Sequence, residues 1–166
     1  MTPKLSGRII RTFNQNIEAP PDHVFPLLCP VREGEWLDGW AEECEMIHSS
    51  SGFAEEGCIF QTRMPGRPVT TWMITKHHLL ERVVEFARIT EGLVATNLQI
   101  KVEPRGADAS SVWIQYIHTP LSEAGRSFLA ENYHESAFRE DMAWWEDSMN
   151  HWLSHGDILR APVEQQ

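Results

Sequence analysis

A change of hydrophobic period at Pro120 constrains the fold of this chain more than any other feature. Before it, a segment of about eighty residues repeatedly alternates apolar and polar side chains, a period of two that predicts β-strands. After it, residues 122–155 contain no proline and space their apolar side chains three or four positions apart, which predicts an amphipathic helix. A sheet followed by one long helix buries both apolar surfaces only if the sheet curls around the helix.

Six strand-like stretches fill residues 41–120. Each is rich in β-branched or aromatic residues, as in PVTTWMITKHH, RVVEFARIT and SSVWIQYIHTPL. The links between them are short and supply glycine or aspartate for tight turns, as in SSSG, MPGR and RGAD. Strands joined by such short links pair with their neighbours, so the segment predicts an antiparallel meander.

A further strand is predicted over residues 8–18, where Ile9, Phe13 and Ile17 alternate with polar residues. Residues 21–40 are predicted to form two short helices, the first starting at Pro21. The expected fold class is therefore α+β: a curved antiparallel sheet of seven strands around a long C-terminal helix. A chain of 166 residues suits one domain, and we expect a single domain over residues 1–166.

The long helix is predicted to run from Ser122, a suitable N-cap, to His155, before Gly156. A kink is expected near Gly125. One apolar stripe joins Phe128, Phe138, Met142, Trp145, Met149 and Trp152.

Composition and the lack of motifs exclude several functions. The net charge of −10 disfavours binding to phosphate backbones, so no nucleic acid is expected as a partner. No apolar run approaches the length of a membrane span and no signal peptide is evident, which predicts a soluble, cytoplasmic protein. The three cysteines lack CxxC spacing, and glycine-rich phosphate loops and GxSxG are absent, so no metal and no cofactor are expected. The sequence leaves a homodimer open.

This order of elements, together with five motifs, resembles the SRPBCC superfamily, the START-like and birch-pollen-allergen-like group that includes polyketide cyclases. More narrowly, it resembles a bacterial branch of small members. The motifs are IEAPPDHVFPLL at 17–28, CPVREGEWLDGW at 29–40, EEGCIFQT at 55–62, WMITKH at 72–77 and HTPLSEAG at 118–125. The resemblance implies a helix-grip fold, with a cavity between sheet and helix that is closed at one end by the short helices. Most members bind an apolar small molecule there, and some are enzymes.

The stretch LCPVREGEWLDGW carries two indoles, Trp36 and Trp40, between glycines. Residues four apart share a face on a helical turn, and the resemblance places this segment at the mouth of the cavity. We predict that the two indoles cover a bound apolar ligand. In the alternative interpretation they only fill the end of the core, because tryptophan is buried wherever it occurs in most proteins.

The full set of predicted ligand-binding residues follows from the same architecture. It comprises Trp36, Trp40, Trp72, Phe86, Tyr116, His118, Phe138, Met142 and Trp145. Arg88 shares the strand face of Val84 and Phe86, and if that face is inward the arginine needs a carboxylate partner. More often, an arginine in such a strand lies on the convex, wet side of the sheet.

The candidate catalytic residues are Tyr116, His118, His134 and Glu135. Continuing the helix stripe backward from Phe138 reaches Glu135, beside His134, while Tyr116 and His118 alternate along the last strand. Carboxyl or imidazole groups facing an apolar cavity would have shifted pKa values suited to acid–base chemistry. In the alternative, the stripe drifts so that Tyr133 faces the sheet and the glutamates face water. A metal on the two histidines and Glu131 or Glu135 lacks any supporting spacing.

Three functions are compatible with these observations. The first is binding of an apolar or aromatic small molecule in the internal cavity. The second is a polyketide cyclase-like or dehydratase-like enzyme that uses the same cavity, and the sequence leaves open whether the protein is an enzyme. The third is an interaction protein whose interior is filled by its own side chains.

Overall fold

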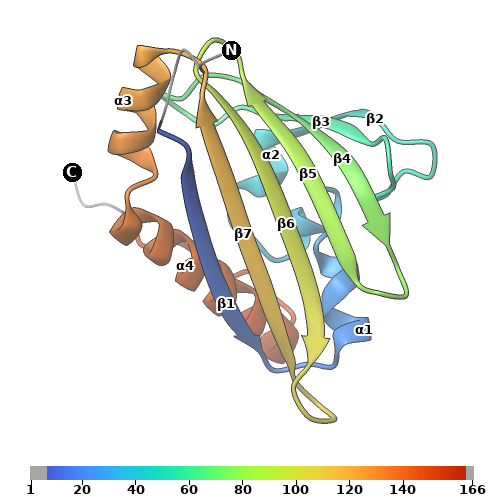
Figure 1. Ribbon diagram of the computed structural model, residues 1–166. Helices are drawn as coiled ribbons and strands as arrows, with labels where there is room; N and C mark the ends of the chain where they lie inside the picture. The colour runs from blue at the N-terminus through green and yellow to red at the C-terminus, as the bar shows by residue number, and fades with distance from the viewer. Residues whose placement is uncertain (1–6, 164–166) are drawn as a thin grey trace.

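A computed structural model describes residues 7–163, and its elements follow the predicted order (Figure 1). The ends of the predicted domain, residues 1–6 and 164–166, lie outside the described residues. The strands are β1 (Ile9–Ile17), β2 (Cys44–His48), β3 (Ile59–Thr62), β4 (Thr70–His78), β5 (Val83–Thr90), β6 (Val94–Pro104) and β7 (Ser110–Pro120). The helices are α1 (Pro21–Val24), α2 (Trp40–Glu43), α3 (Glu123–Asn132) and α4 (Glu135–His155), with the 3-10 helices η1 (Phe25–Leu27) and η2 (Arg32–Glu35).

The seven strands form one antiparallel sheet, which confirms the predicted fold class. Their order is β1-β7-β6-β5-β4-β3-β2, so β2 to β7 make the expected meander and β1 pairs with β7. The register shifts in β2 between Met46 and His48, and in β4 between Ile74 and Lys76. Irregularities of this kind bend strands, and the sheet curves around the helices as Figure 1 shows.

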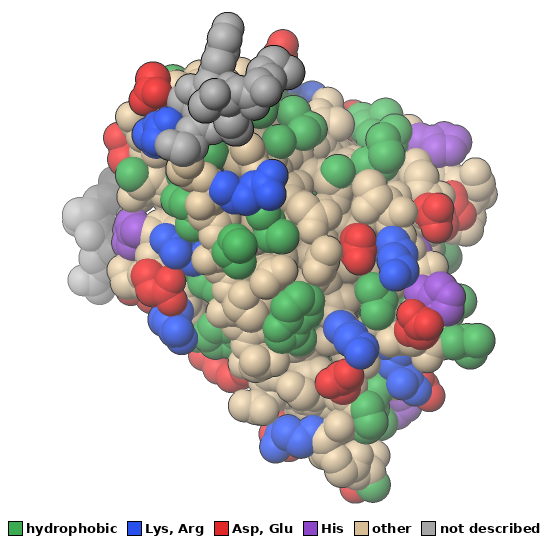
Figure 2. Space-filling view, in the orientation of Figure 1, with side chains coloured by type: hydrophobic (Ala, Val, Ile, Leu, Met, Phe, Trp, Pro, Cys, Tyr) green, Lys and Arg blue, Asp and Glu red, His purple; other side chains and the backbone are tan. Residues whose placement is uncertain are grey.

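The sheet has one buried and one wetter face. On β7 every second residue is buried, among them Val112, Ile114 and Tyr116, while the residues between them are partly exposed. The helices cover the buried face. Figure 2 shows the molecule in the same orientation as Figure 1, and on this face acidic and basic side chains are interspersed with apolar ones. One such pair is Lys101 with Glu103, whose charged atoms are 2.8 Å apart.

The predicted helix over residues 122–155 is broken into α3 and α4, which corrects the sequence analysis. Ser122 caps α3 as expected, its hydroxyl accepting a hydrogen bond from the backbone N–H of Gly125. The chain does not kink at Gly125 but leaves the helical conformation at Tyr133. His134 then caps α4 by accepting a hydrogen bond from the N–H of Ala137 at 3.3 Å. Because the break resets the register, the two halves do not share one stripe.

Helix α4 is fastened to the first strand. The Gln15 side chain donates a hydrogen bond to the backbone carbonyl of Met142 at 3.0 Å, and the ring of Phe13 meets that of Phe138 edge-on at 6.4 Å. Phe138, Met142 and Met149 are buried beneath the helix. Within residues 7–163, no helix combines the length and the hydropathy needed to cross a membrane.

Candidate functional site

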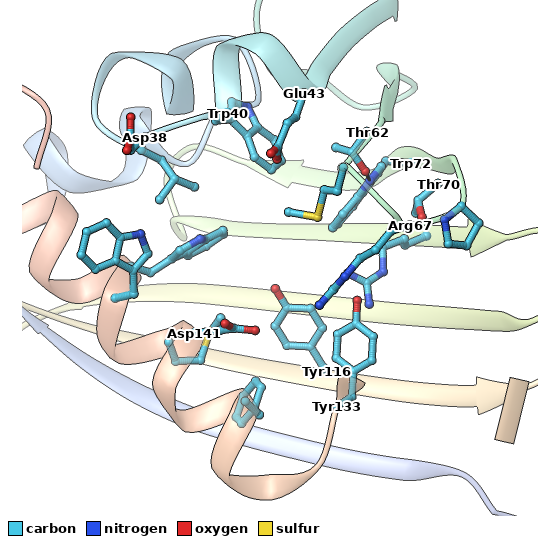
Figure 3. A pocket seen from close by; sticks show the side chains of 18 of the residues that line it. Asp38, Trp40, Glu43, Thr62, Arg67, Thr70, Trp72, Tyr116, Tyr133 and Asp141 are labelled. Atoms are coloured by element: carbon cyan, nitrogen blue, oxygen red, sulfur yellow. Dashed lines mark hydrogen bonds between the residues drawn. The ribbon is translucent and has the colours of Figure 1, made fainter. Parts of the chain in front are cut away.

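The sheet and the C-terminal helices enclose a cavity of about 420 Å³. Its walls come from α2, the loop that joins β3 to β4, the central strands, and the two helices α3 and α4. The lining residues include the aromatic side chains Trp40, Trp72, Tyr116, Phe128, Tyr133, Phe138, Trp144 and Trp145 and the charged side chains Asp38, Glu43, Arg67, Arg88 and Asp141. Figure 3 shows this cavity, with Tyr116 and Tyr133 pointing into it.

Arg88 of β5 lies on the concave side of the sheet, contrary to the expectation from the sequence. Its register explains the difference, because it is paired with Trp72 on β4 and with Thr96 on β6, both of which are buried. The side chain is itself only 9% exposed. Its guanidinium carbon lies 4.9 Å from the ring centroid of Trp72, 5.5 Å from that of Tyr116 and 5.2 Å from that of Tyr133. The arginine is thus held among aromatic rings by cation–π contacts.

Two carboxyl groups point into the cavity from opposite sides, Glu43 from α2 and Asp141 from α4 (Figure 3). Burial raises the pKa of both above their ordinary values, and the positive charge of Arg67 at the rim partly opposes the rise. Arg67 itself is exposed. The cavity therefore carries carboxyl groups on two opposite walls, one on α2 and one on α4.

The predicted ligand-binding residues divide between cavity wall and core. Trp40, Trp72, Tyr116, Phe138, Met142 and Trp145 line the cavity. Phe86 lies behind Trp72, with the two rings edge-on at 6.0 Å, and borders a separate void of only about 20 Å³. His118 is fully buried, and the ring of Tyr133 lies 4.7 Å from its own. These two residues support the wall from behind without lining it.

The two indoles of LCPVREGEWLDGW have different environments. Trp36 is fully buried, donates its ring N–H to the carbonyl of Leu27 at 3.0 Å, and packs edge-on against Trp145 at 5.7 Å. Trp40 lines the cavity and donates to the carbonyl of Pro30 at 2.7 Å. The two indoles do not lie on one helical turn. The helix η2 ends before Trp36, and α2 begins only after Gly39, which has a φ of 83°. Trp36 fills the core, and only Trp40 reaches the cavity.

The structure does not bring the four candidate catalytic residues together. Tyr116 and His118 stack along β7 at 5.6 Å, but His134 and Glu135 are exposed and do not line the cavity. Glu135 forms ion pairs with Arg11 at 3.3 Å and Arg139 at 3.0 Å. The break before α4 is the physical reason, since it turns these two residues outward and leaves Tyr133 facing the sheet. The alternative interpretation of the helix is the one observed.

His118 is buried as a neutral side chain. Burial, reinforced by the positive charges of Arg88 and Arg11, lowers its pKa to about 3. Its Nδ1 atom shares a hydrogen bond with the hydroxyl of Thr96 at 2.8 Å, while Nε2 has no partner within residues 7–163. Such a group does not accept a proton near neutral pH.

The charged side chains of the cavity, together with Tyr133, were not predicted as site residues. Arg88 carried a usable signal, because it shares a strand face with the apolar Val84 and Phe86. Asp141 directly precedes the apolar position Met142, so it lies at the border of the buried stripe. For Arg67 and Glu43 the sequence offers no signal, because both depend on how a loop and a short helix fold over the sheet.

A curved seven-stranded antiparallel sheet that grips a C-terminal helix, with a cavity between them, defines a helix-grip protein. Comparison with solved structures confirms this fold. No protein-family model matches the sequence, and no curated protein matches it significantly.

Three of the similar structures illustrate the breadth of that fold. Norcoclaurine synthase from Thalictrum flavum, in complex with dopamine and hydroxybenzaldehyde, is 17% identical, with a TM-score of 0.67 over 93% of this chain and 98% of that one. The Zhui aromatase/cyclase from Streptomyces sp. R1128 is 9% identical, with a TM-score of 0.62 over 92% of this chain and 100% of that one. Ginseng major latex-like protein 151 from Panax ginseng is 13% identical, with a TM-score of 0.60 over 86% of this chain and 95% of that one. At these identities the likeness establishes the fold.

Proposed function

We propose that this protein binds a planar aromatic or otherwise apolar small molecule in the cavity between the sheet and α4. The observation that carries the proposal is a cavity of about 420 Å³, partly open to solvent, whose walls carry many aromatic rings. Pockets for small molecules occupy roughly 300–1,000 Å³ and are lined mainly by apolar and aromatic side chains. The cavity fits that description.

Two of the four indoles in the wall, those of Trp40 and Trp72, have their ring N–H groups already bonded to the protein. The ring N–H of Trp72 donates to the hydroxyl of Thr62 at 3.0 Å, and that of Trp40 donates to a backbone carbonyl. Trp72 is also stacked on Phe60, with ring centroids 5.4 Å apart, which holds it in place. The fixed ring faces of these two indoles favour flat, apolar partners.

The similar structures give independent support. Norcoclaurine synthase was solved with dopamine and hydroxybenzaldehyde, which are small aromatic molecules, and another similar protein is an aromatase/cyclase. The same fold therefore accommodates aromatic compounds elsewhere, and an aromatic ligand is the class that this cavity suits best.

The test uses an uncharged fluorescent probe, N-phenylnaphthylamine. We expect saturable binding to the wild type and binding weakened about fivefold, or about 1 kcal/mol, in Trp144→Ala, which removes a cavity-lining ring. Trp152→Ala is the matched control, because Trp152 is also half-buried on α4 but does not line the cavity. Cooperative unfolding of each variant verifies that the probe reports on a folded protein. The proposal fails if the wild type shows no saturable binding, or if both variants lose affinity equally.

A cyclase-like or dehydratase-like activity in the same cavity is the second candidate, and Asp141 is the observation that favours it. Asp141 lines the cavity, and burial raises its pKa above the ordinary value, so its carboxyl group is placed to exchange a proton with a bound molecule. Mass spectrometry of molecules that co-purify with the wild type and with Asp141→Asn separates the two functions. A carrier retains the same molecule in both, whereas an enzyme retains an unreacted substrate in the variant.

A further inference from the structure

We infer that the ligand is an aromatic acid, and that Arg88 binds its carboxylate or equivalent oxyanion beside the aromatic wall. This inference rests on the proposed function and specifies the ligand of the same cavity. Its central observation is a buried arginine in the cavity wall that no described carboxylate neutralises.

The environment of Arg88 differs from that of the exposed arginines. Several of those form ion pairs, such as Arg82 with Asp22 at 2.8 Å and Arg139 with Glu135 at 3.0 Å. Arg88 is only 9% exposed, and within residues 7–163 its guanidinium makes no ion pair and no side-chain hydrogen bond. Burying a charge without a partner is costly, so buried arginines are normally paired. The missing partner is what a ligand can supply.

The surrounding rings satisfy only part of what the guanidinium requires. Trp72, Tyr116 and Tyr133 surround it at 4.9–5.5 Å and stabilise its charge through their π-systems. The five N–H donors of an arginine point along the edges of its plane, where oxygen acceptors bind them. A carboxylate meets two of these donors at once, and such paired bonds are among the strongest in proteins.

The carboxyl groups of the cavity do not take this place. Neither Glu43 nor Asp141 has an oxygen within 4.0 Å of the Arg88 nitrogens, and Arg67 is the cation that lowers the pKa of both. Tyr116 remains a neutral phenol, because burial raises its pKa more than the nearby Arg88 lowers it. Arg88 is therefore the charge available to an incoming anion.

The geometry also relates the anion to the aromatic body of the ligand. Arg88 lies over the ring of Trp72, which lines the cavity. The ring of Trp72 is in turn stacked with that of Phe60. An oxyanion on Arg88 therefore places the attached ring system next to Trp72 and Tyr116. A flat molecule with an acidic group on its ring meets both requirements.

A matched pair of probes tests the inference. Anilinonaphthalene sulfonate differs from N-phenylnaphthylamine by one sulfonate group. We expect the wild type to bind the sulfonate at least about tenfold more tightly, which corresponds to about 1.4 kcal/mol. The chain has a net charge of −10, which disfavours general attraction of anions, so a preference for the charged probe indicates a specific cation.

Two variants make the same change of charge within the same cavity. Arg88→Met should reduce the preference for the sulfonate to within about twofold while N-phenylnaphthylamine still binds. Arg67→Met should keep most of the preference, because Arg67 is exposed and lies among acidic groups.

The inference is overturned if the wild type binds the two probes equally, or if Arg88→Met keeps the preference. If either result is obtained while the neutral probe still binds, the proposed function stands. If the wild type does not bind the neutral probe, the proposed function and the inference about Arg88 both fail. If Arg88→Met does not fold, competition on the wild type decides. Naphthoate should then displace the sulfonate probe at a concentration at least about tenfold lower than naphthalenemethanol does, and equal displacement would refute the role of Arg88.

Discussion

Gly125 of α3 and Leu93 of the turn between β5 and β6 approach so closely that a Cβ atom on Gly125 would lie 1.8 Å from the carbonyl oxygen of Leu93. The same carbonyl accepts a hydrogen bond from the backbone N–H of Leu121 at 2.8 Å. Backbone therefore packs on backbone where the sheet leads into α3. Glycine is required here by lack of space, since Gly125 is helical and has no unusual φ.

Gly125→Ala should therefore lower the free energy of unfolding by about 2–3 kcal/mol, although alanine is the better helix former. Urea denaturation followed by circular dichroism measures this difference. Ser127→Ala is the control, because Ser127 is exposed on the same helix and its replacement should change stability by less than about 0.5 kcal/mol. Equal stability of Gly125→Ala and the wild type would mean that α3 sits farther from the sheet.

Trp36 and Trp40 should separate stability from binding. Trp36→Phe removes a buried indole and its hydrogen bond to Leu27, so we expect a loss of about 2 kcal/mol in unfolding free energy and unchanged probe affinity. Trp40→Phe should weaken binding of N-phenylnaphthylamine by up to about fivefold, because Trp40 lines the cavity. A loss of affinity in Trp36→Phe with no loss of stability would restore a direct role for Trp36 in covering the ligand.

Glu33 should make stability fall as the pH rises. Its carboxyl is buried, and burial raises its pKa from the ordinary value of 4.5 to about 8. Between these values the folded protein holds a proton that the unfolded chain has lost, so unfolding becomes easier by about 1.4 kcal/mol per pH unit. Glu33→Gln should flatten the stability profile from pH 4.5 to 8. The control is Glu35→Gln, because Glu35 is an exposed neighbour. This substitution should leave the pH dependence of the unfolding free energy unchanged.

His118 should act in the opposite direction at lower pH. Its pKa falls from the ordinary value of 6.5 to about 3, so below pH 6.5 the unfolded chain binds a proton that the folded protein excludes. Stability is therefore lost as the pH falls from 6.5 toward 3. With Glu33 opposing it, the combined profile of these two groups should be highest between pH 4.5 and 6.5. Chemical denaturation at a series of pH values measures this profile. In His118→Asn the loss of unfolding free energy below pH 6.5 should be smaller than in the wild type, and an unchanged loss would assign it to other groups.

His134 should be a capping residue rather than a catalytic one. Replacing it with alanine removes the acceptor for the N–H of Ala137 and should cost about 1 kcal/mol, whereas His134→Asn should keep the stability of the wild type. Probe binding should be the same in both variants, since His134 does not line the cavity. If His134→Ala altered binding but not stability, His134 would belong to the site after all.

The strands were predictable because their pattern is local. Along β7 the alternation of apolar and polar residues matches the alternation of burial, and the turns carry their usual glycines. The break after Tyr133 was not predictable, since neither glycine nor proline marks it and the cap is a histidine ring. Arg88 shows the other limit. Its strand face, shared with Val84 and Phe86, indicated an inward position, but the rings that surround it come from three separate segments, which no local pattern reports.

The pairing of β1 with β7 has a consequence for the order in which the chain acquires its structure. Ile9 lies opposite His118, and Ile17 lies opposite Ser110, so the first strand of the chain finds its partner in the last. During synthesis on the ribosome, residues 9–17 must wait until about a hundred further residues have emerged. Contacts so distant in sequence close slowly, because the intervening chain must first be ordered. The meander of β2 to β7 can form while β1 still lacks its partner, and arrival of β1 then completes the sheet and gives α4 its support.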